Sequence, residues 1–386
     1  MSKENYKYLS ANILDASDLS GLKYSKSTVR KAGIVLKQKD ISDDERDDAM
    51  FVLSNYRASH KAPLLYVTSI LFDESILVDR DVIVAKRFKR TPSIVKKLTN
   101  FSSMDLDRMQ DIAGCRAIFS NKKKLEKVRR VLVKKNMNFR IKNYIDKPKK
   151  DGYRGVHLIC TCDNPKSSYK FFVEIQLRTK IQHSWATAIE IVDLLTNQQL
   201  KSNQQLKTGI VKDEWLDFFK IIADSFEKLD NNEKISFDLL KQSIKLIKKM
   251  KIHEKFSAFA QSLKFIESQN YEIDIGYNLI LIDLKEEKIE VESYHKHDFD
   301  KAVKNYLDAE REASMSKNLV TALVSTESIT NLKDAYPNYF ADSAYFLEHI
   351  SQLEFLYESN KIGFFDKLIN QLSNFEDKST RERNLN

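Results

Sequence analysis

Polar and apolar side chains alternate most clearly at residues 173–178, where Val173, Ile175 and Leu177 interleave with a polar set. Because side chains point alternately to the two faces of a β-strand, the apolar set can face a core while the polar set shares one surface. Strand character recurs in four segments, 112–120, 138–146, 155–163 and 169–179, and a helical apolar repeat occupies 122–135. This order predicts an α+β domain, a mixed β-sheet flanked by helices.

Helix signals dominate the residues before this sheet. Residues 42–60 begin with a serine, carry acids in the first turn and continue as an apolar stripe, which is typical of a helix start. The apolar spacing predicts a further helical stretch through residues 62–89, and a short helix over 91–101 with Pro92 near its first turn. Residues 1 to about 40 are polar and basic, and we expect them to be loosely ordered.

The second half of the chain is organised differently. Residues 205–272 show helical apolar spacing, and a smaller α/β domain follows with a hairpin around residues 285–287, a helix over 298–313, a strand over 319–325 and a helix over 343–359. The aromatic-rich stretch 335–346 is expected to be packed core, with a recognition surface as the alternative, and the last residues are expected to form a frayed tail. We therefore divide the chain into an N-terminal segment 1–44, a first domain 45–204, a helical segment 205–272 and a C-terminal α/β domain 273–386.

Composition narrows the function classes. Of 386 residues, 42% are hydrophobic and 31% charged, as in ordinary globular proteins, and the net charge of +9 favours a polyanionic partner such as nucleotides or tRNA. A basic surface without any such ligand is equally compatible with this charge.

The cysteines point to the cellular compartment. Cys115, Cys160 and Cys162 suit neither a disulfide framework nor a metal quartet, which indicates a reducing compartment. The first 20 residues are polar and lack the apolar core of a signal peptide, and no apolar run approaches the roughly 20 residues that span a bilayer. We expect a cytoplasmic protein with no membrane partner.

Two carboxylates are placed for a metal. Asp111 immediately precedes one predicted strand and Glu174 lies on another, and Mg²⁺ is commonly held by one or two carboxylates together with substrate phosphates. Upstream, Ser93 and Lys97 lie four residues apart on a predicted helix, an arrangement suited to binding a polyphosphate. A solvated basic helix is the alternative interpretation of that stretch.

A basic loop at residues 146–157 contains an aromatic ring on which a nucleotide base could stack. It contains Lys147, Lys149 and Lys150, and the ring of Tyr153 could stack on a base. Asp151 could accept hydrogen bonds from the N1–H and the N2 amine of guanine. A basic turn with an incidental tyrosine explains the same residues. The sequence contains no Ser-His-Asp order, no Cys/His metal spacing and no Walker loop to suggest another chemistry.

Four stretches, "RFKRTPSIVKK", "DIAGCRAIF", "YIDKPKKDGYRGVH" and "VEIQLRTKIQHSWA", resemble the signature blocks of the RelA/SpoT alarmone synthetase domain, in the family's order and over about residues 45–200. The resemblance implies a GTP diphosphokinase-type pyrophosphotransferase. Such an enzyme moves pyrophosphate from ATP to the ribose 3′-hydroxyl of GDP or GTP and makes ppGpp or pppGpp. The chain departs from the family at Asp151, where Asn is common, and at Gly155, where Ser is common.

The resemblance also implies roles for individual residues. Asp111 and Glu174 would be catalytic and hold Mg²⁺, and Glu174 would help to deprotonate the attacking hydroxyl. The donor ATP would be bound by Arg87 and Arg116, which sandwich the adenine, and by Lys89, Ser93 and Lys97, which hold the phosphates. The guanine nucleotide would be bound by Lys150, Asp151, Tyr153, His157 and Gln176.

Other functions remain open on sequence grounds. A toxic relative that pyrophosphorylates the 3′ end of tRNA would use the same catalytic site, and an inactive nucleotide sensor would bind partners through the second half. The long bifunctional family members carry a hydrolase domain ahead of the synthetase, and only about 45 residues precede it here, so we expect no hydrolase activity. For residues 205–386, which carry no catalytic pattern, we expect a regulatory, homo-oligomeric or partner-binding role.

Overall fold

The protein is represented by a computed structural model that describes residues 22–38, 40–135, 137, 139–164, 167–196, 211–268, 275–283, 285–286, 288–316, 318–325 and 342–361. It divides into two compact units. The first comprises residues 1–148 and 154–180, and the second comprises residues 149–153 and 181–386.

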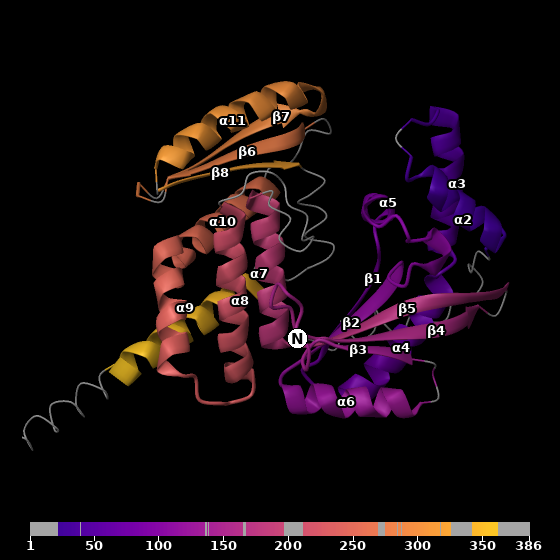
Figure 1. The fold of residues 1–386 in the computed structure, drawn as a ribbon, viewed down its shortest axis with the longest axis horizontal. Coiled ribbons are helices and arrows are strands. Elements are labelled where there is room, and N and C mark those ends of the chain that lie inside the picture. The colour runs from indigo at the N-terminus through magenta and orange to yellow at the C-terminus, as the bar shows by residue number, and fades with distance from the viewer. Residues whose placement is uncertain are drawn as a thin grey trace, which may run out of the picture. The chain divides into compact units, whose positions relative to one another are not determined.

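A five-stranded sheet forms the centre of the first unit (Figure 1). Its strands are β1 (Ile83–Phe88), β2 (Ala113–Phe119), β3 (Phe139–Asn143), β4 (Val156–Asn164) and β5 (Ser167–Thr179), in the order β1-β2-β5-β4-β3. The pair β2 and β5 is parallel, whereas the other neighbouring pairs are antiparallel. The sheet is therefore mixed, which confirms the predicted fold class.

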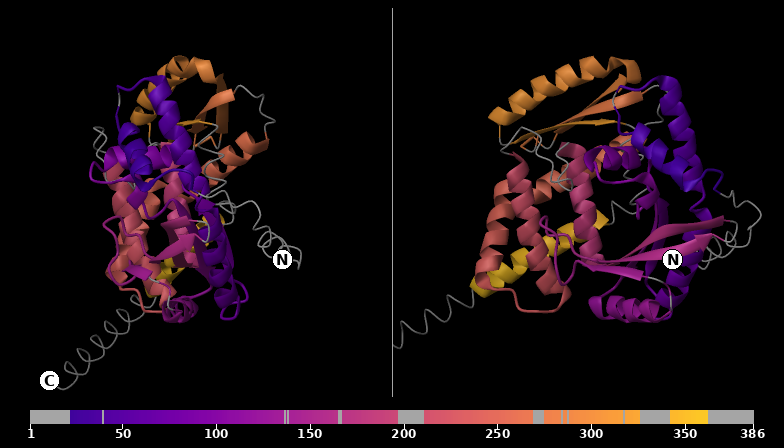
Figure 2. Two further views of the ribbon diagram at one scale, coloured as in Figure 1. Left: turned by 90° about the vertical axis from the view of Figure 1, so that its right-hand side faces the viewer. Right: turned by 45° about the vertical axis from the view of Figure 1, so that its right-hand side comes forward.

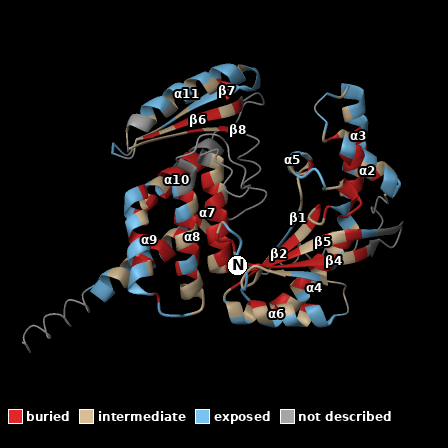
Figure 3. Cartoon of the chain, viewed as in Figure 1, coloured by how far each residue is buried: buried red, intermediate tan, exposed pale blue. Residues whose placement is uncertain are grey.

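The first unit also contains helices, some of which pack on this sheet. They are α2 (Lys26–Val35), α3 (Asp43–Ala58), α4 (Lys61–Ile76), α5 (Thr91–Asn100), the 3₁₀ turn η2 (Leu106–Arg108) and α6 (Lys122–Lys134). The predicted start of α3 is confirmed, since Ser42 and Glu45 form a reciprocal capping box. The helices α4 and α6 pack on the apolar face of the sheet, where Cys115, Leu158 and Ile175 are buried (Figure 3).

Two sequence predictions for the first unit were wrong. The helix expected through residues 62–89 ends at Ile76, and residues 83–88 form β1, whose β-branched start pairs antiparallel with β2. The segment expected to be loosely ordered contains α2. Val29 and Ala32 of this helix join one buried cluster with Leu53 and Tyr56 of α3, so the predicted boundary after residue 44 separates elements that pack together.

The second unit begins with helices. They are α7 (Lys180–Thr196), which belongs to this unit from residue 181, α8 (Val211–Asp230), α9 (Phe237–Met250), α10 (Ile252–Ser268) and the helical residues 342–361. The aromatic rings of Phe218, Phe226 and Phe256 all lie within 7 Å of the ring of Phe346, which anchors the last helix. Lys251, in the left-handed region at φ 51°, separates α9 from α10. The predicted domain boundary after residue 204 thus differs from the observed division after Lys180.

A small antiparallel sheet completes the second unit. Its strands β6 (Ile275–Asp283), β7 (Lys288–His295) and β8 (Leu319–Ser325) lie in the order β7-β6-β8, and α11 (Phe299–Met315) lies along one face (Figure 2). The predicted hairpin is confirmed, and Asp283 caps its turn by accepting hydrogen bonds from the backbone N–H groups of Lys285 and Glu286. Most of the aromatic-rich stretch, residues 335–341, and the tail lie outside the described residues.

No helix in the described part of the chain is both long and apolar enough to cross a membrane.

Candidate active site

Strand register places the predicted polar residues on one face of the mixed sheet. Arg87 on β1, Gly114 on β2 and Glu174 on β5 lie opposite one another. One row further along, Gln176 lies between Arg116 on β2 and His157 on β4. Since directly paired residues project to the same face, these side chains share a surface opposite the buried apolar core. The alternation predicted for residues 173–178 is confirmed.

Glu174 is held by two hydrogen bonds from neighbouring side chains. The ring Nδ1 of His157 lies 2.9 Å from Oε1 of Glu174, and Nε2 of Gln176 donates to Oε2 at 2.8 Å. Burial alone would raise the pKa of Glu174, but the two hydrogen bonds and the charges of His157 and Arg87 outweigh it and hold this pKa well below its usual range. Because the ionised carboxylate only accepts, the proton of the His157 ring must lie on Nδ1.

Asp111 is paired with two lysines from different elements. Nζ of Lys89, just after β1, lies 3.1 Å from one carboxylate oxygen, and Nζ of Lys97 on α5 lies 2.8 Å from the other. Burial raises the pKa of Asp111, but the two ammonium groups lower it further than burial raises it. The charge of Glu174 acts on Asp111 in the opposite sense, so the two carboxylates lie within electrostatic reach of each other.

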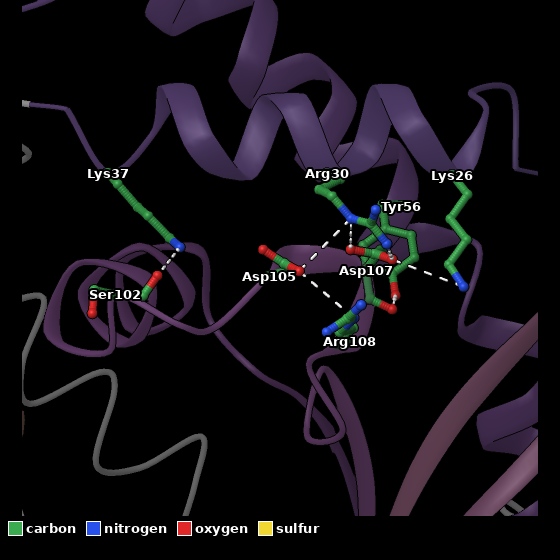
Figure 4. A network of polar contacts seen from close by, with 8 residues as sticks. All are labelled: Lys26, Arg30, Lys37, Tyr56, Ser102, Asp105, Asp107 and Arg108. Atoms are coloured by element: carbon green, nitrogen blue, oxygen red, sulfur yellow. Dashed lines mark hydrogen bonds and ion pairs between the residues drawn. The ribbon is translucent and has the colours of Figure 1, made fainter.

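A partly buried ion pair anchors the segment that leads to Asp111 (Figure 4). The guanidinium of Arg30 on α2 donates to both carboxylate oxygens of Asp107, at 3.1 and 2.9 Å, and the Asp107 side chain is fully buried. The hydroxyl of Tyr56 on α3 donates to the backbone carbonyl of Asp107 at 3.4 Å. Arg30 also lies 3.7 Å from Asp105. The helices α2 and α3 therefore fix a short turn that ends three residues before Asp111.

The backbone of Lys89 is fixed at both of its polar groups. Its N–H donates to the carbonyl of Ile112 at 2.7 Å, and its carbonyl accepts a hydrogen bond from Nε of Arg57 at 2.8 Å. The Arg57 guanidinium also lies 5.2 Å from the ring centroid of Phe88. Sequence reasoning did not identify Arg57, since an arginine on an amphipathic helix gives no signal that distinguishes it from a surface residue.

The predicted ATP-binding residues lie in three different environments. Lys89 and Lys97 meet at Asp111, whereas Arg116 is buried and its Nε donates to Oε1 of Gln176 at 3.4 Å. Arg87 and Ser93 are exposed. Arg178, which also follows the alternation of β5 but had no predicted role, donates to the same Gln176 oxygen at 3.2 Å.

The predicted guanine-binding residues are divided between the two units. His157 and Gln176 lie in the first unit beside Glu174, whereas Lys150, Asp151 and Tyr153 belong to the second.

Within the second unit the Tyr153 ring is 6% exposed, with Nζ of Lys149 4.5 Å from its centroid and the Trp185 ring 6.4 Å away. A carboxylate oxygen of Asp151 accepts a hydrogen bond from the Tyr153 N–H at 2.9 Å. Stacking of guanine on the Tyr153 ring stays a prediction.

The two carboxylates have the chemistry that Mg²⁺ requires. In the described part of the chain, no group of three or more His, Cys, Asp or Glu side chains is arranged to hold a metal ion. Asp111 and Glu174 are nonetheless oxygen donors whose lowered pKa values keep them ionised at neutral pH. Two ionised carboxylates completed by substrate phosphates form a common type of Mg²⁺ site, so the residues present fit this ion.

Comparison with known proteins finds a family match for one part of the chain. Residues 86–192 match the family described as "Region found in RelA / SpoT proteins". The chain is similar to the small alarmone synthetase 1 from Bacillus subtilis bound to its product pppGpp, with 21% identity, coverage of 46% of this chain and 93% of that one, and a TM-score of 0.39.

Two further solved structures are similar. The small alarmone synthetase 2 from Bacillus subtilis has 26% identity, coverage of 47% of this chain and 95% of that one, and a TM-score of 0.36. A GTP pyrophosphokinase family protein from Streptococcus pneumoniae has 23% identity, coverage of 43% and 87%, and a TM-score of 0.32. No curated protein matches the chain. The family match, rather than these structural likenesses, supports the assignment of residues 86–192 to the RelA/SpoT family.

Proposed function

Residues 86–192 form a RelA/SpoT-type domain, and we propose that this domain transfers pyrophosphate from ATP to the ribose 3′-hydroxyl of GDP or GTP, giving ppGpp or pppGpp. The observation that supports this most directly is the pairing of Asp111 with Lys89 and Lys97, within electrostatic reach of Glu174. The site thus combines a pair of ionised carboxylates with two cations that can donate hydrogen bonds to phosphate oxygens.

Lys89 and Lys97 would bind the phosphates of the donor. Each ammonium group has three N–H donors, so each can keep its contact with Asp111 and still donate to a phosphate oxygen. Arg87 and Arg116 would contact the adenine, and Ser93, exposed in the first turn of α5, would add a hydroxyl donor to the phosphates. Such a site acts by positioning and by neutralising charge, which are the main contributions of proteins to phosphoryl-group transfer.

Asp111 and Glu174 would hold Mg²⁺, which supplies charge neutralisation at the phosphates of the donor. Glu174 would also orient the attacking hydroxyl by accepting a hydrogen bond from it. The strongly lowered pKa of Glu174 makes it a weak base, so we expect orientation rather than complete proton transfer to this carboxylate. His157 and Gln176 would fix the carboxylate during this contact through their hydrogen bonds.

The acceptor is decided by a direct assay. Purified protein is incubated with Mg²⁺, γ-labelled ATP and either GDP, GTP or bulk tRNA, and the labelled products are separated. We expect label in the guanine nucleotide. Label in tRNA instead would assign the chain to the toxic tRNA-modifying type, for which the net charge of +9 is the favourable observation. An absence of transfer to all three acceptors would contradict the proposed activity.

A further inference from the structure

Helix α3 contacts both segments that carry the Lys89–Asp111 pair, and it does so through two consecutive residues. The Tyr56 hydroxyl donates to the Asp107 carbonyl at 3.4 Å, in the segment that leads to Asp111. Nε of Arg57 donates to the Lys89 carbonyl at 2.8 Å. One rigid helix thus touches the backbone on either side of the ion pair.

The contact between Arg57 and Lys89 is well defined. The Arg57 guanidinium lies 5.2 Å from the centroid of Phe88, the residue before Lys89, so a ring contact and a hydrogen bond orient the same group. The Arg57 side chain is only partly exposed, and this burial lowers the pKa of its guanidinium. Among the described residues no carboxylate forms an ion pair with Arg57. Its hydrogen bond to the Lys89 carbonyl is therefore the main polar contact that offsets this desolvation.

The hydrogen bond from Arg57 leaves the Lys89 backbone little conformational freedom. Its N–H is bound to the Ile112 carbonyl, its carbonyl to Arg57, and its Nζ lies 3.1 Å from Asp111. Losing the Arg57 contact would free the carbonyl end of Lys89, at the point where the chain leaves β1 for α5. The lysine would then spend less time in the orientation that presents its ammonium group beside Asp111.

We propose that Arg57 is a positioning residue of the donor-nucleotide site, which acts through the Lys89 carbonyl and sets the geometry between Lys89 and Asp111. This inference rests on the proposed function for the identity of the ligand, ATP. It adds to that function a residue on α3 that lies outside the matched range 86–192.

A double-mutant cycle tests the inference. Arg57→Met removes the N–H donor while keeping an apolar chain near Phe88, and Lys89→Met removes the ammonium group. Affinity for the non-transferable analogue α,β-methylene-ATP is measured for both single variants and for the double variant. We expect Arg57→Met to weaken binding about tenfold, the size of one charge-assisted hydrogen bond, and to have almost no further effect in the Lys89→Met background. Arg57→Lys, which keeps a cationic donor, is expected to recover most of the affinity.

The matched control is Arg46→Met, an arginine-to-methionine change on the same helix, and it is expected to leave binding unchanged. An equal loss from Arg57→Met with and without Lys89 would overturn the proposal, because it would show that Arg57 acts on the fold or on the ligand independently of Lys89. Unchanged binding in Arg57→Met would overturn it as well. If Arg57→Met does not fold, the cycle is measured with Arg57→Leu, which also lacks the N–H donor, and the same two outcomes decide.

Binding and transfer are measured separately so that the two proposals can fail separately. If the unaltered protein binds the analogue but transfers no pyrophosphate, the proposed function is wrong and the cycle still decides the role of Arg57. If transfer occurs and the cycle shows no coupling, only the role of Arg57 is wrong. A protein that does not bind the analogue at all would overturn both.

Discussion

Gly114 faces Glu174 across the parallel pair of β2 and β5, and a Cβ atom on Gly114 would lie 2.9 Å from the backbone carbonyl oxygen of Glu174. That distance is shorter than ordinary van der Waals contact, and the neighbouring atom is backbone rather than the end of a flexible side chain. The absence of a side chain at Gly114 therefore lets the two strands approach at the residue that carries the central carboxylate.

Gly114→Ala should impair transfer more than it impairs folding. Overpacking in a well-ordered region costs about 1–3 kcal/mol, and here the strain is relieved by moving the Glu174 backbone away from its position beside His157 and Gln176. We expect a folded protein with a lower midpoint of thermal unfolding and at least about a tenfold lower kcat. Thermal unfolding and steady-state kinetics on the same preparation check this. A variant with the normal kcat would show that the close approach does not position Glu174.

Neutral replacements of the two carboxylates should abolish transfer while the fold is kept. Asp111→Asn and Glu174→Gln each remove an ionised ligand for Mg²⁺, and we expect a loss of about 10²-fold or more in kcat. Asp111→Asn also releases Lys89 and Lys97 from their ion pairs. Affinity for an ATP analogue in the absence of Mg²⁺ should therefore be unchanged or higher in this variant. Near-normal turnover in either variant would contradict the site assignment.

The sequence was sufficient to predict the polar face of the sheet, because strand alternation depends only on local order. Glu174 and Gln176 were therefore assigned to one surface correctly, whereas the position of His157 beside them depends on the register between β4 and β5. It was not sufficient for β1, whose apolar residues continue the apolar pattern of α4 closely enough to resemble a longer helix. The pairing of Lys97 with Asp111 and the contact of Arg57 with Lys89 depend on how α5 and α3 pack, which no local pattern determines.

Tyr153→Ala should raise the KM for the guanine acceptor and leave the KM for ATP unchanged. Base–aromatic stacking contributes roughly 1–3 kcal/mol, so the expected rise is about ten- to a hundredfold. The ammonium group of Lys149 lies over the ring and would have to leave for a base to stack there. Tyr153→Phe keeps the ring and is expected to behave like the unaltered protein. An equal rise in the KM for ATP would mean that this loop serves the donor instead.

His60 should make the protein less stable in mildly acidic solution. Its ring is fully buried between Tyr56 and Phe171, and burial lowers its pKa from 6.5 to about 4. Between these two values the unfolded chain binds a proton that the folded chain does not, so the free energy of unfolding falls as the pH falls from 6.5 towards 4. The full difference corresponds to about 3 kcal/mol. Chemical unfolding at pH 7, 6 and 5 measures it, and His60→Asn should flatten the dependence in this range. The same slope in both proteins would exclude His60 as its source.

A chain ending near residue 200 keeps every predicted catalytic group, and from the sequence pattern it should either lose regulation or assembly or expose an apolar surface that the missing helices cover. The structure shows that α7 packs against α8, which such a chain lacks. Nε1 of Trp185 on α7 donates to the carbonyl of Phe219 on α8 at 3.0 Å, and the two rings lie 5.8 Å apart. Removing α8 exposes the Trp185 face of α7, so we expect this chain to self-associate. A chain ending at Lys180 removes α7 as well, and it should stay monomeric and bind an ATP analogue. Sedimentation and circular dichroism of both chains check this. If the chain ending near residue 200 instead matches the full-length protein in size, rate and response to nucleotides, the second unit has no regulatory or assembly role.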